Sequence, residues 1–181
     1  MSDRADRIEA LYAQVPPIPD CKGRCWISCG PADIFPWERR RLAAAGHKIT
    51  PDATARLAIR DFWCEALGPD GKCMAYPIRP LICRLWGAVE WLSCPHSCQP
   101  EGGWMPDADA IRLLYEMTRL GGAGIPVTEE DLAWLDDPVK VTAVAAAFAA
   151  RERGEIDRFH AYGTKLPIAI TSRKGQGTCR K

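Results

Sequence analysis

The sequence has no long hydrophobic run and little net charge. Its longest stretch of low polarity, residues 143–150, is far shorter than the roughly 20 apolar residues of a membrane helix. Residues 1–7 are polar, and no apolar segment follows them, so no secretory signal is expected. The formal charge of +1 gives no general attraction to nucleic acid or to anionic membrane. These absences predict a cytoplasmic protein without membrane or nucleic-acid partners.

Several catalytic patterns are also missing. No two cysteines have the C-x2-C spacing, which excludes a thioredoxin-type dithiol. The chain has only 3 histidines, and none forms a recognisable nucleophile pair with a cysteine. No glycine-rich segment resembles an adenosylmethionine site. The sequence therefore shows no catalytic constellation, and whether the protein is an enzyme stays open.

Cysteine is the residue that the sequence concentrates. Of its 9 cysteines, all but Cys179 fall between positions 21 and 98. Thiolates are preferred ligands of zinc and of iron–sulfur clusters, and both need several sulfurs that converge on one point. Thiols stay reduced in the cytoplasm, so metal binding is the main hypothesis and disulfides are the alternative. The predicted metal ligands are Cys21, Cys25, Cys29, Cys64, Cys73, Cys83, Cys94 and Cys98.

The spacing of these cysteines allows two four-sulfur sites, or one site with spare members. Three cysteines lie in one loop, four positions apart, over residues 21–29, and a second loop holds Cys94 and Cys98. Three local cysteines with one distant cysteine commonly hold a cubane cluster, which slightly favours iron–sulfur over Zn²⁺. His96 is either a substitute ligand or an ordinary loop residue. Cys179 lies in a basic tail and is not predicted to be a ligand.

The expected fold is mainly α-helical with a small β-hairpin: a compact, metal-organised, cysteine-rich domain surrounded by helices. Three parts are predicted, namely a cysteine-cluster region with an N-terminal helix (1–104), a helical extension packed on it (105–170) and a flexible basic tail (171–181). Apolar periodicity, prolines and glycines place the elements. Helices are expected over 4–15, 36–46, 51–60, 83–85, 108–120, 129–135, 138–153 and 155–162, and the hairpin over 62–76.

One segment resembles a known family signature. Residues 73–84 read C-M-A-Y-P-I-R-P-L-I-C-R, which is similar to the C-x-x-Y-x-x-R-P-x-x-C-R element of the YkgJ-type cysteine-cluster family. Members of that family are described as zinc- or iron-chelating proteins and also carry an N-terminal C-x2-C-x2-C-C cluster. Here Cys21, Cys25 and Cys29 occupy the equivalent place, so the resemblance covers residues 21–98. It implies metal binding and brings no established reaction.

This sequence departs from the family pattern at its first cluster. The gaps are three residues long, and Gly30 follows Cys29 where the family has a second cysteine. One ligand of the first site must then come from elsewhere, either Cys64 or one of the Cys94–Cys98 pair. Within the signature, Arg79 and Arg84 are candidates for offsetting the thiolate charge and donating to sulfur, or for salt bridges to carboxylates.

Two functional hypotheses follow. The first is a structural, partner-binding protein whose cysteine cluster holds an iron–sulfur cluster or zinc, with a protein as partner. The alternative is a component of an iron–sulfur-dependent redox or protein-modifying enzyme. Near-neutral charge and the lack of a basic recognition helix weaken a third, zinc-dependent nucleic-acid binding.

Overall fold

The three-dimensional description comes from a computed structural model of the chain. It describes residues 2–19, 21, 29, 34–50, 63–94, 96–122 and 128–147. The expected helices over 51–60 and 155–162, the tail over 171–181, Cys25 and Cys179 lie outside these ranges.

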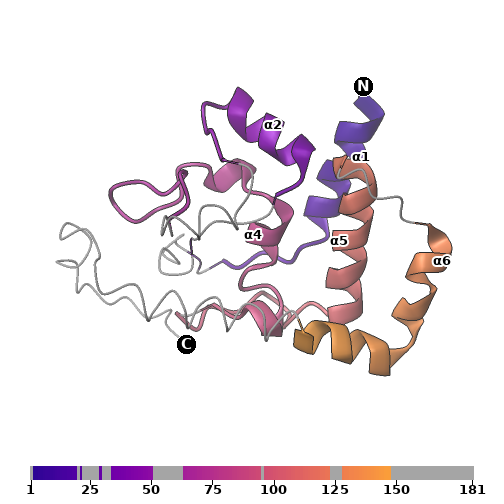
Figure 1. Ribbon diagram of the computed structural model, residues 1–181. Coiled ribbons are helices and arrows are strands. Elements are labelled where there is room, and N and C mark those ends of the chain that lie inside the picture. Colours follow the sequence, from indigo (N-terminus) through magenta and orange to yellow (C-terminus); the bar gives the residue numbers. More distant parts are fainter. Residues whose placement is uncertain are drawn as a thin grey trace.

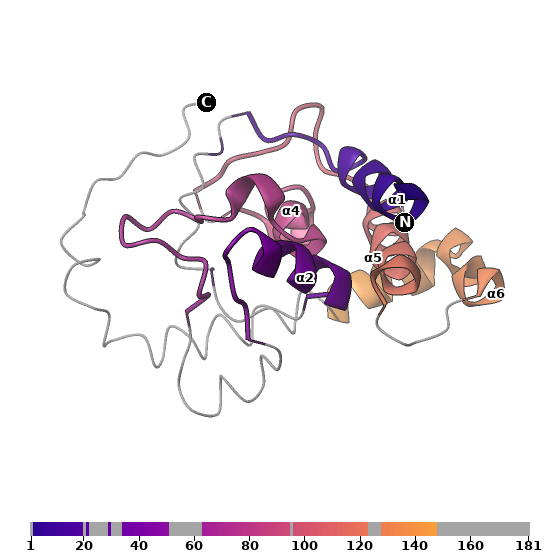
Figure 2. The same cartoon turned by 90° about the horizontal axis from the view of Figure 1, so that it is seen from above.

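The main core forms where three helices meet. Helix α1 (Ser2–Ala13) lies beside α5 (Asp107–Gly121), and the short α4 (Leu81–Leu85) packs against the same helix (Figures 1 and 2). The core therefore takes residues from both sides of position 104, so the cysteine region and the helical extension share buried apolar surface. Its buried members are Ile8, Leu11, Tyr12, Leu81, Leu85, Val89, Leu92, Met105, Ala110, Leu113, Met117 and Leu120.

Helix boundaries follow the proline and glycine signals. Helix α1 ends just before the prolines at 16 and 17, and α2 (Pro36–Ala44) has its proline in the first turn. Helix α5 ends at Gly122, whose φ of +81° is the left-handed conformation that glycine adopts most readily. These three helix predictions are confirmed. Pro106 takes the cap position at the start of α5, and no side chain caps the helix there.

The predicted β-hairpin over 62–76 is not supported. No strand occurs in the part of the chain that the structure describes, and one isolated antiparallel bridge joins Leu67 to Cys73. Around it, the amide of Gly68 donates to the carbonyl of Lys72 at 2.8 Å. The segment is thus a tight turn, because the glycines and proline between positions 68 and 71 leave too few paired residues for strands.

The signature segment forms short helices. A 3-10 turn, η2 (Tyr76–Ile78), precedes α4, and η3 (Glu90–Leu92) follows it. Helix α4 agrees with the helical stretch predicted over 83–85, whereas η2 was not predicted. A second, smaller core lies beneath this region and takes in Cys64 and Cys73 at its edge. Its buried members are Ile34, Leu42, Ile49, Ala66 and Ala75.

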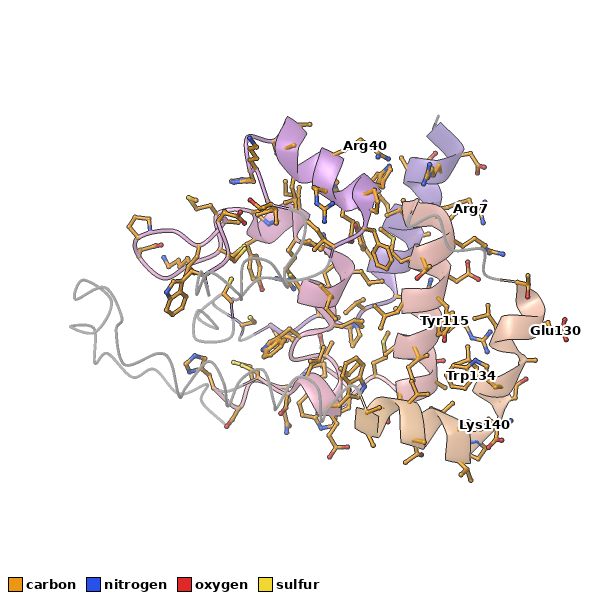
Figure 3. All side chains as sticks on the ribbon, in the orientation of Figure 1. Arg7, Arg40, Tyr115, Glu130, Trp134 and Lys140 are labelled. Carbon is orange, nitrogen blue, oxygen red and sulfur yellow. The ribbon has the colours of Figure 1, made fainter. Side chains whose placement is uncertain are left out.

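The remaining helices pack on the far side of α5. Helix α6 (Glu129–Leu132) runs into η4 (Ala133–Asp136), and residues 138–147 are also helical. Tyr115 of α5 and Trp134 of η4 meet edge to face, with ring centroids 5.9 Å apart (Figure 3). These elements agree with the helices predicted over 129–135 and, within the described range, over 138–153.

Candidate metal centre

Four of the predicted ligands are brought together by the fold. They are Cys29 from the first cysteine loop, Cys64 and Cys73 on either side of the tight turn, and Cys83 in α4. The amide of Cys64 donates to the carbonyl of Cys29 at 2.9 Å, and the thiols of the same two residues are hydrogen-bonded. The bridge between Leu67 and Cys73 brings Cys73 back beside the segment that carries Cys64. Segments that are distant in sequence thus meet at one group of sulfurs.

The electrostatics of these four thiols shows how close they are. The pKa of Cys29 is raised far above its usual range, first by the hydrogen bond to Cys64, then by burial and by the charges of Cys64, Cys83 and Cys73. Burial raises the pKa of Cys73, and the nearby Cys64 adds to that rise. Without a cation Cys29 and Cys73 are therefore neutral thiols at ordinary pH, since a thiolate at either position would be destabilised by its burial and by its neighbours.

Cys83 differs from the other three in its surroundings. Burial is the largest cause that raises the pKa of its thiol, and the charges of Cys64, Glu38 and Cys73 raise it further. The residue nevertheless exposes surface to solvent. An exposed thiol within a group of sulfurs is accessible to an incoming ion.

The structure separates the roles of the two signature arginines. The charge of Arg79 lowers the pKa of both Cys73 and Cys83, and its guanidinium stacks on the ring of Tyr76 at 3.9 Å. Within the described ranges its buried Nε has no hydrogen-bond partner. Arg84 instead donates to backbone carbonyls, from Nε to Arg79 at 2.9 Å and from Nη2 to Pro77 at 3.0 Å. Neither arginine forms an ion pair with Glu65 or Glu90 among the interactions of the described residues.

Tyr76 connects the first cysteine loop to the signature. Its hydroxyl is hydrogen-bonded to the thiol of Cys21, and its pKa is raised by burial and by that thiol, while Arg79 lowers it. Cys21 therefore lies beside the signature, on the side of Arg79.

The second cysteine pair forms its own turn. The amide of His96 donates to Cys94 Sγ at 3.4 Å, and the amide of Ser97 donates to the carbonyl of Cys94 at 3.0 Å. Cys94 is a buried free thiol, whereas Cys98 is disulfide-bonded. Cys98 can therefore act as a thiolate ligand only after reduction. The His96 contact with Cys94 Sγ is thus made by its backbone amide.

A buried carboxylate beneath the site was not predicted from the sequence. Glu38 of α2 is 2% exposed, and its Oε1 accepts from the hydroxyl of Tyr12 at 2.8 Å and from the amide of Leu81 at 2.7 Å. Its Oε2 accepts from the amide of Phe35 at 3.2 Å. Burial raises its pKa, and these bonds together with Arg84 oppose the rise. The only sequence signal was a glutamate in the first turn of a helix, which looks like an ordinary capping residue.

The four sulfurs are neighbours but do not form a preassembled site. Among the described residues, no three histidine, cysteine, aspartate or glutamate side chains are already arranged to hold a metal ion. The donor set itself fits a metal, because four neighbouring thiols can each exchange a proton for a bond to a cation. Binding would then draw the four sulfurs closer together.

Comparison with known families agrees with this donor chemistry. Residues 20–99 match the CxxCxxCC family, described as a "Putative zinc- or iron-chelating domain". The predicted family resemblance is therefore confirmed for this segment. The match supports metal binding and fits zinc and iron equally well. No curated protein and no solved structure matches the chain.

The structure also bears on the membrane prediction. None of the helices in the described ranges combines the length and the apolar character that crossing a bilayer requires.

Proposed function

We propose that the protein is a metal-binding protein in which Cys29, Cys64, Cys73 and Cys83 hold one metal centre with a structural role. The observation that carries the proposal is the mutual electrostatic coupling of these four thiols at a point where distant segments meet. All four lie within the matched segment 20–99. Four thiolates suit zinc and iron–sulfur clusters equally, and either would supply a covalent cross-link between the segments.

The architecture around the sulfurs supports a structural role. Among the described residues, the core beneath Cys64 and Cys73 has five buried members, two of them alanine. The turn above it is joined by a single bridge. Bound metal commonly supplies stability where short segments of this kind meet. A metal that ties residue 29 to residue 83 would fix this region against the main core.

The remaining predicted ligands belong to a second proposal about the same region. Cys21, Cys25, Cys94 and Cys98 would form a second site or remain outside the first. Arg79 would offset negative charge at the first site, since its charge already acts on Cys73 and Cys83. Arg84 would act at a distance, by holding the backbone of the turn before α4.

Anaerobic purification followed by elemental analysis and an absorption spectrum tests the proposal. A colourless protein with about one zinc per chain, or a brown protein with iron and sulfide, would support it and decide the metal. Replacing Cys73 and Cys83 by serine should abolish that binding. A reduced, folded protein that takes up neither metal would refute it.

A further inference from the structure

Cys83 lies on a helix that is too short to be stable without contacts from the rest of the protein. Helix α4 has only five residues, its cap position is Pro80, and no side chain caps it locally. Isolated helices of this length are unstable in water, and the first amides of a helix have no partner within it. The position of Cys83 must therefore be set by contacts from outside α4.

One such contact comes from the buried carboxylate of Glu38. Its Oε1 receives the amide of Leu81, the first residue of α4, at 2.7 Å. The same oxygen receives the hydroxyl of Tyr12 from α1 at 2.8 Å, and Oε2 receives the amide of Phe35. One side chain thus ties the start of α4 to both α1 and α2.

The energetics argue that this carboxylate is not simple core filling. Burying a charged carboxylate costs several kcal/mol unless its oxygens are well paired, whereas a leucine would fill similar volume at no such cost. Glu38 is only 2% exposed and spends all three of its hydrogen bonds on placing neighbouring segments. The distance that this arrangement fixes is that between α2 and the start of α4.

The other side of α4 is held by Arg84. Its guanidinium stacks on the ring of Tyr12 at 4.3 Å and donates to the carbonyls of Arg79 and Pro77. Tyr12 therefore touches both anchors, through its hydroxyl to Glu38 and through its ring to Arg84. Between the two anchored ends of this segment lies Cys83.

We propose that Glu38 is a positioning residue of the metal centre: it fixes the start of α4 and so places the sulfur of Cys83 beside those of Cys64 and Cys73. This rests on the proposed function. Metal–sulfur bonds are near 2.3 Å, so a displaced α4 would increase the distance that the Cys83 sulfur must cover on binding and would weaken or remove its bond to the metal. Within the described residues the hydrogen bonds of Glu38 go to Tyr12, Phe35 and Leu81 and to no sulfur. It would place Cys83 through α4, and its charge also raises the pKa of that thiol, an effect that Glu38→Gln removes without removing the acceptor oxygen.

The test loads Co²⁺ onto the reduced full-length chain and records the sulfur-to-cobalt charge-transfer band. In Glu38→Leu we expect the band per bound Co²⁺ to fall by about a quarter, as one of four thiolates is lost. The affinity for Co²⁺ should fall at least tenfold. Glu38→Gln retains an oxygen that can accept from the amide of Leu81. Its charge-transfer band and its affinity for Co²⁺ should therefore both be intermediate between those of wild type and Glu38→Leu.

Leu135→Ala is the control for a purely structural effect. Leu135 is 4% exposed and lies in the core between α5 and η4, away from α4, so its truncation should lower the melting temperature and leave the cobalt spectrum unchanged. The inference would be overturned, with the proposed function intact, if Glu38→Leu gave the same spectrum as wild type. Equal losses of Co²⁺ affinity in Glu38→Leu and Leu135→Ala would overturn it in the same way. Absence of a sulfur-to-cobalt band in wild type would refute the proposed function, and the inference with it.

Discussion

Replacing Tyr12 by phenylalanine should remove its buried, charge-assisted hydrogen bond to Glu38 and a hydroxyl interaction with Arg41, and leave the aromatic ring in place. The hydroxyl lies 2.8 Å from Glu38 Oε1, and the residue is only 5% exposed. Burial first, and Glu38 second, raise the pKa of Tyr12 well above its usual range, so the hydroxyl remains a donor at every ordinary pH. Phenylalanine keeps the ring on which the guanidiniums of Arg84 and Arg41 stack at 4.3 and 5.5 Å.

The expected loss follows from the nature of this bond. Hydrogen bonds to charged groups contribute roughly 1.5–3 kcal/mol, so Tyr12→Phe should lower the free energy of unfolding by about 2 kcal/mol. For a chain of this size that corresponds to a fall of roughly 4–8 °C in melting temperature. Urea unfolding followed by circular dichroism measures the free energy directly.

The matched control is Tyr115→Phe. Tyr115 contacts Trp134 through its ring, and its hydroxyl makes no hydrogen bond within the part of the chain that the structure describes. Its replacement should therefore change the free energy of unfolding by less than about 0.5 kcal/mol. Equal effects of the two substitutions would refute the assignment of stability to the bond between Tyr12 and Glu38.

Four further predictions concern the metal, the ligands, the buried carboxylate and the helix packing. Removing bound metal with a chelator should lower the melting temperature by more than 10 °C, because structural metal sites contribute on the order of 10 kcal/mol; calorimetry with unchanged melting would count against it. Cys83→Ser should lose most bound metal on elemental analysis, and Cys179→Ser should lose none. Burial raises the pKa of Glu38 in the folded state. Its contribution to stability is therefore fully present below about pH 4.3 and declines as the pH rises through the raised pKa. The free energy of unfolding of wild type minus that of Glu38→Gln should fall with pH, and a difference that rises from pH 4 to 7 would contradict this. Gly121→Ala should cost about 1–3 kcal/mol in urea unfolding, because its new Cβ would lie 2.6 Å from Cβ of Phe35; a neutral effect would mean that α5 and the residue before α2 separate easily.

The helices were predictable because their signals are local. Apolar spacing in α1 and the paired glycines after α5 depend only on neighbouring residues, and both predictions are confirmed. The hairpin prediction was wrong because glycine and proline between two apolar segments are equally typical of a turn held by one bridge. Strand pairing depends on contacts that a sequence does not display.

The site was predictable in its chemistry and not in its grouping. Eight clustered cysteines indicated a metal, but nothing in their spacing showed that Cys29 would meet Cys64, Cys73 and Cys83. That grouping depends on the path of the chain between them. Glu38 was missed because its importance comes from burial and from a partner 43 positions away, and neither property is visible in the residues around it.

The most direct test of the account is X-ray absorption at the metal edge of the reduced, metal-loaded protein, with metal content measured on the same sample. We predict coordination by about four sulfurs at roughly 2.3 Å. A change to three sulfurs in Cys64→Ser would tie the signal to this group. Coordination dominated by nitrogen or oxygen, or cysteines bonded pairwise as disulfides under reducing conditions, would contradict the account.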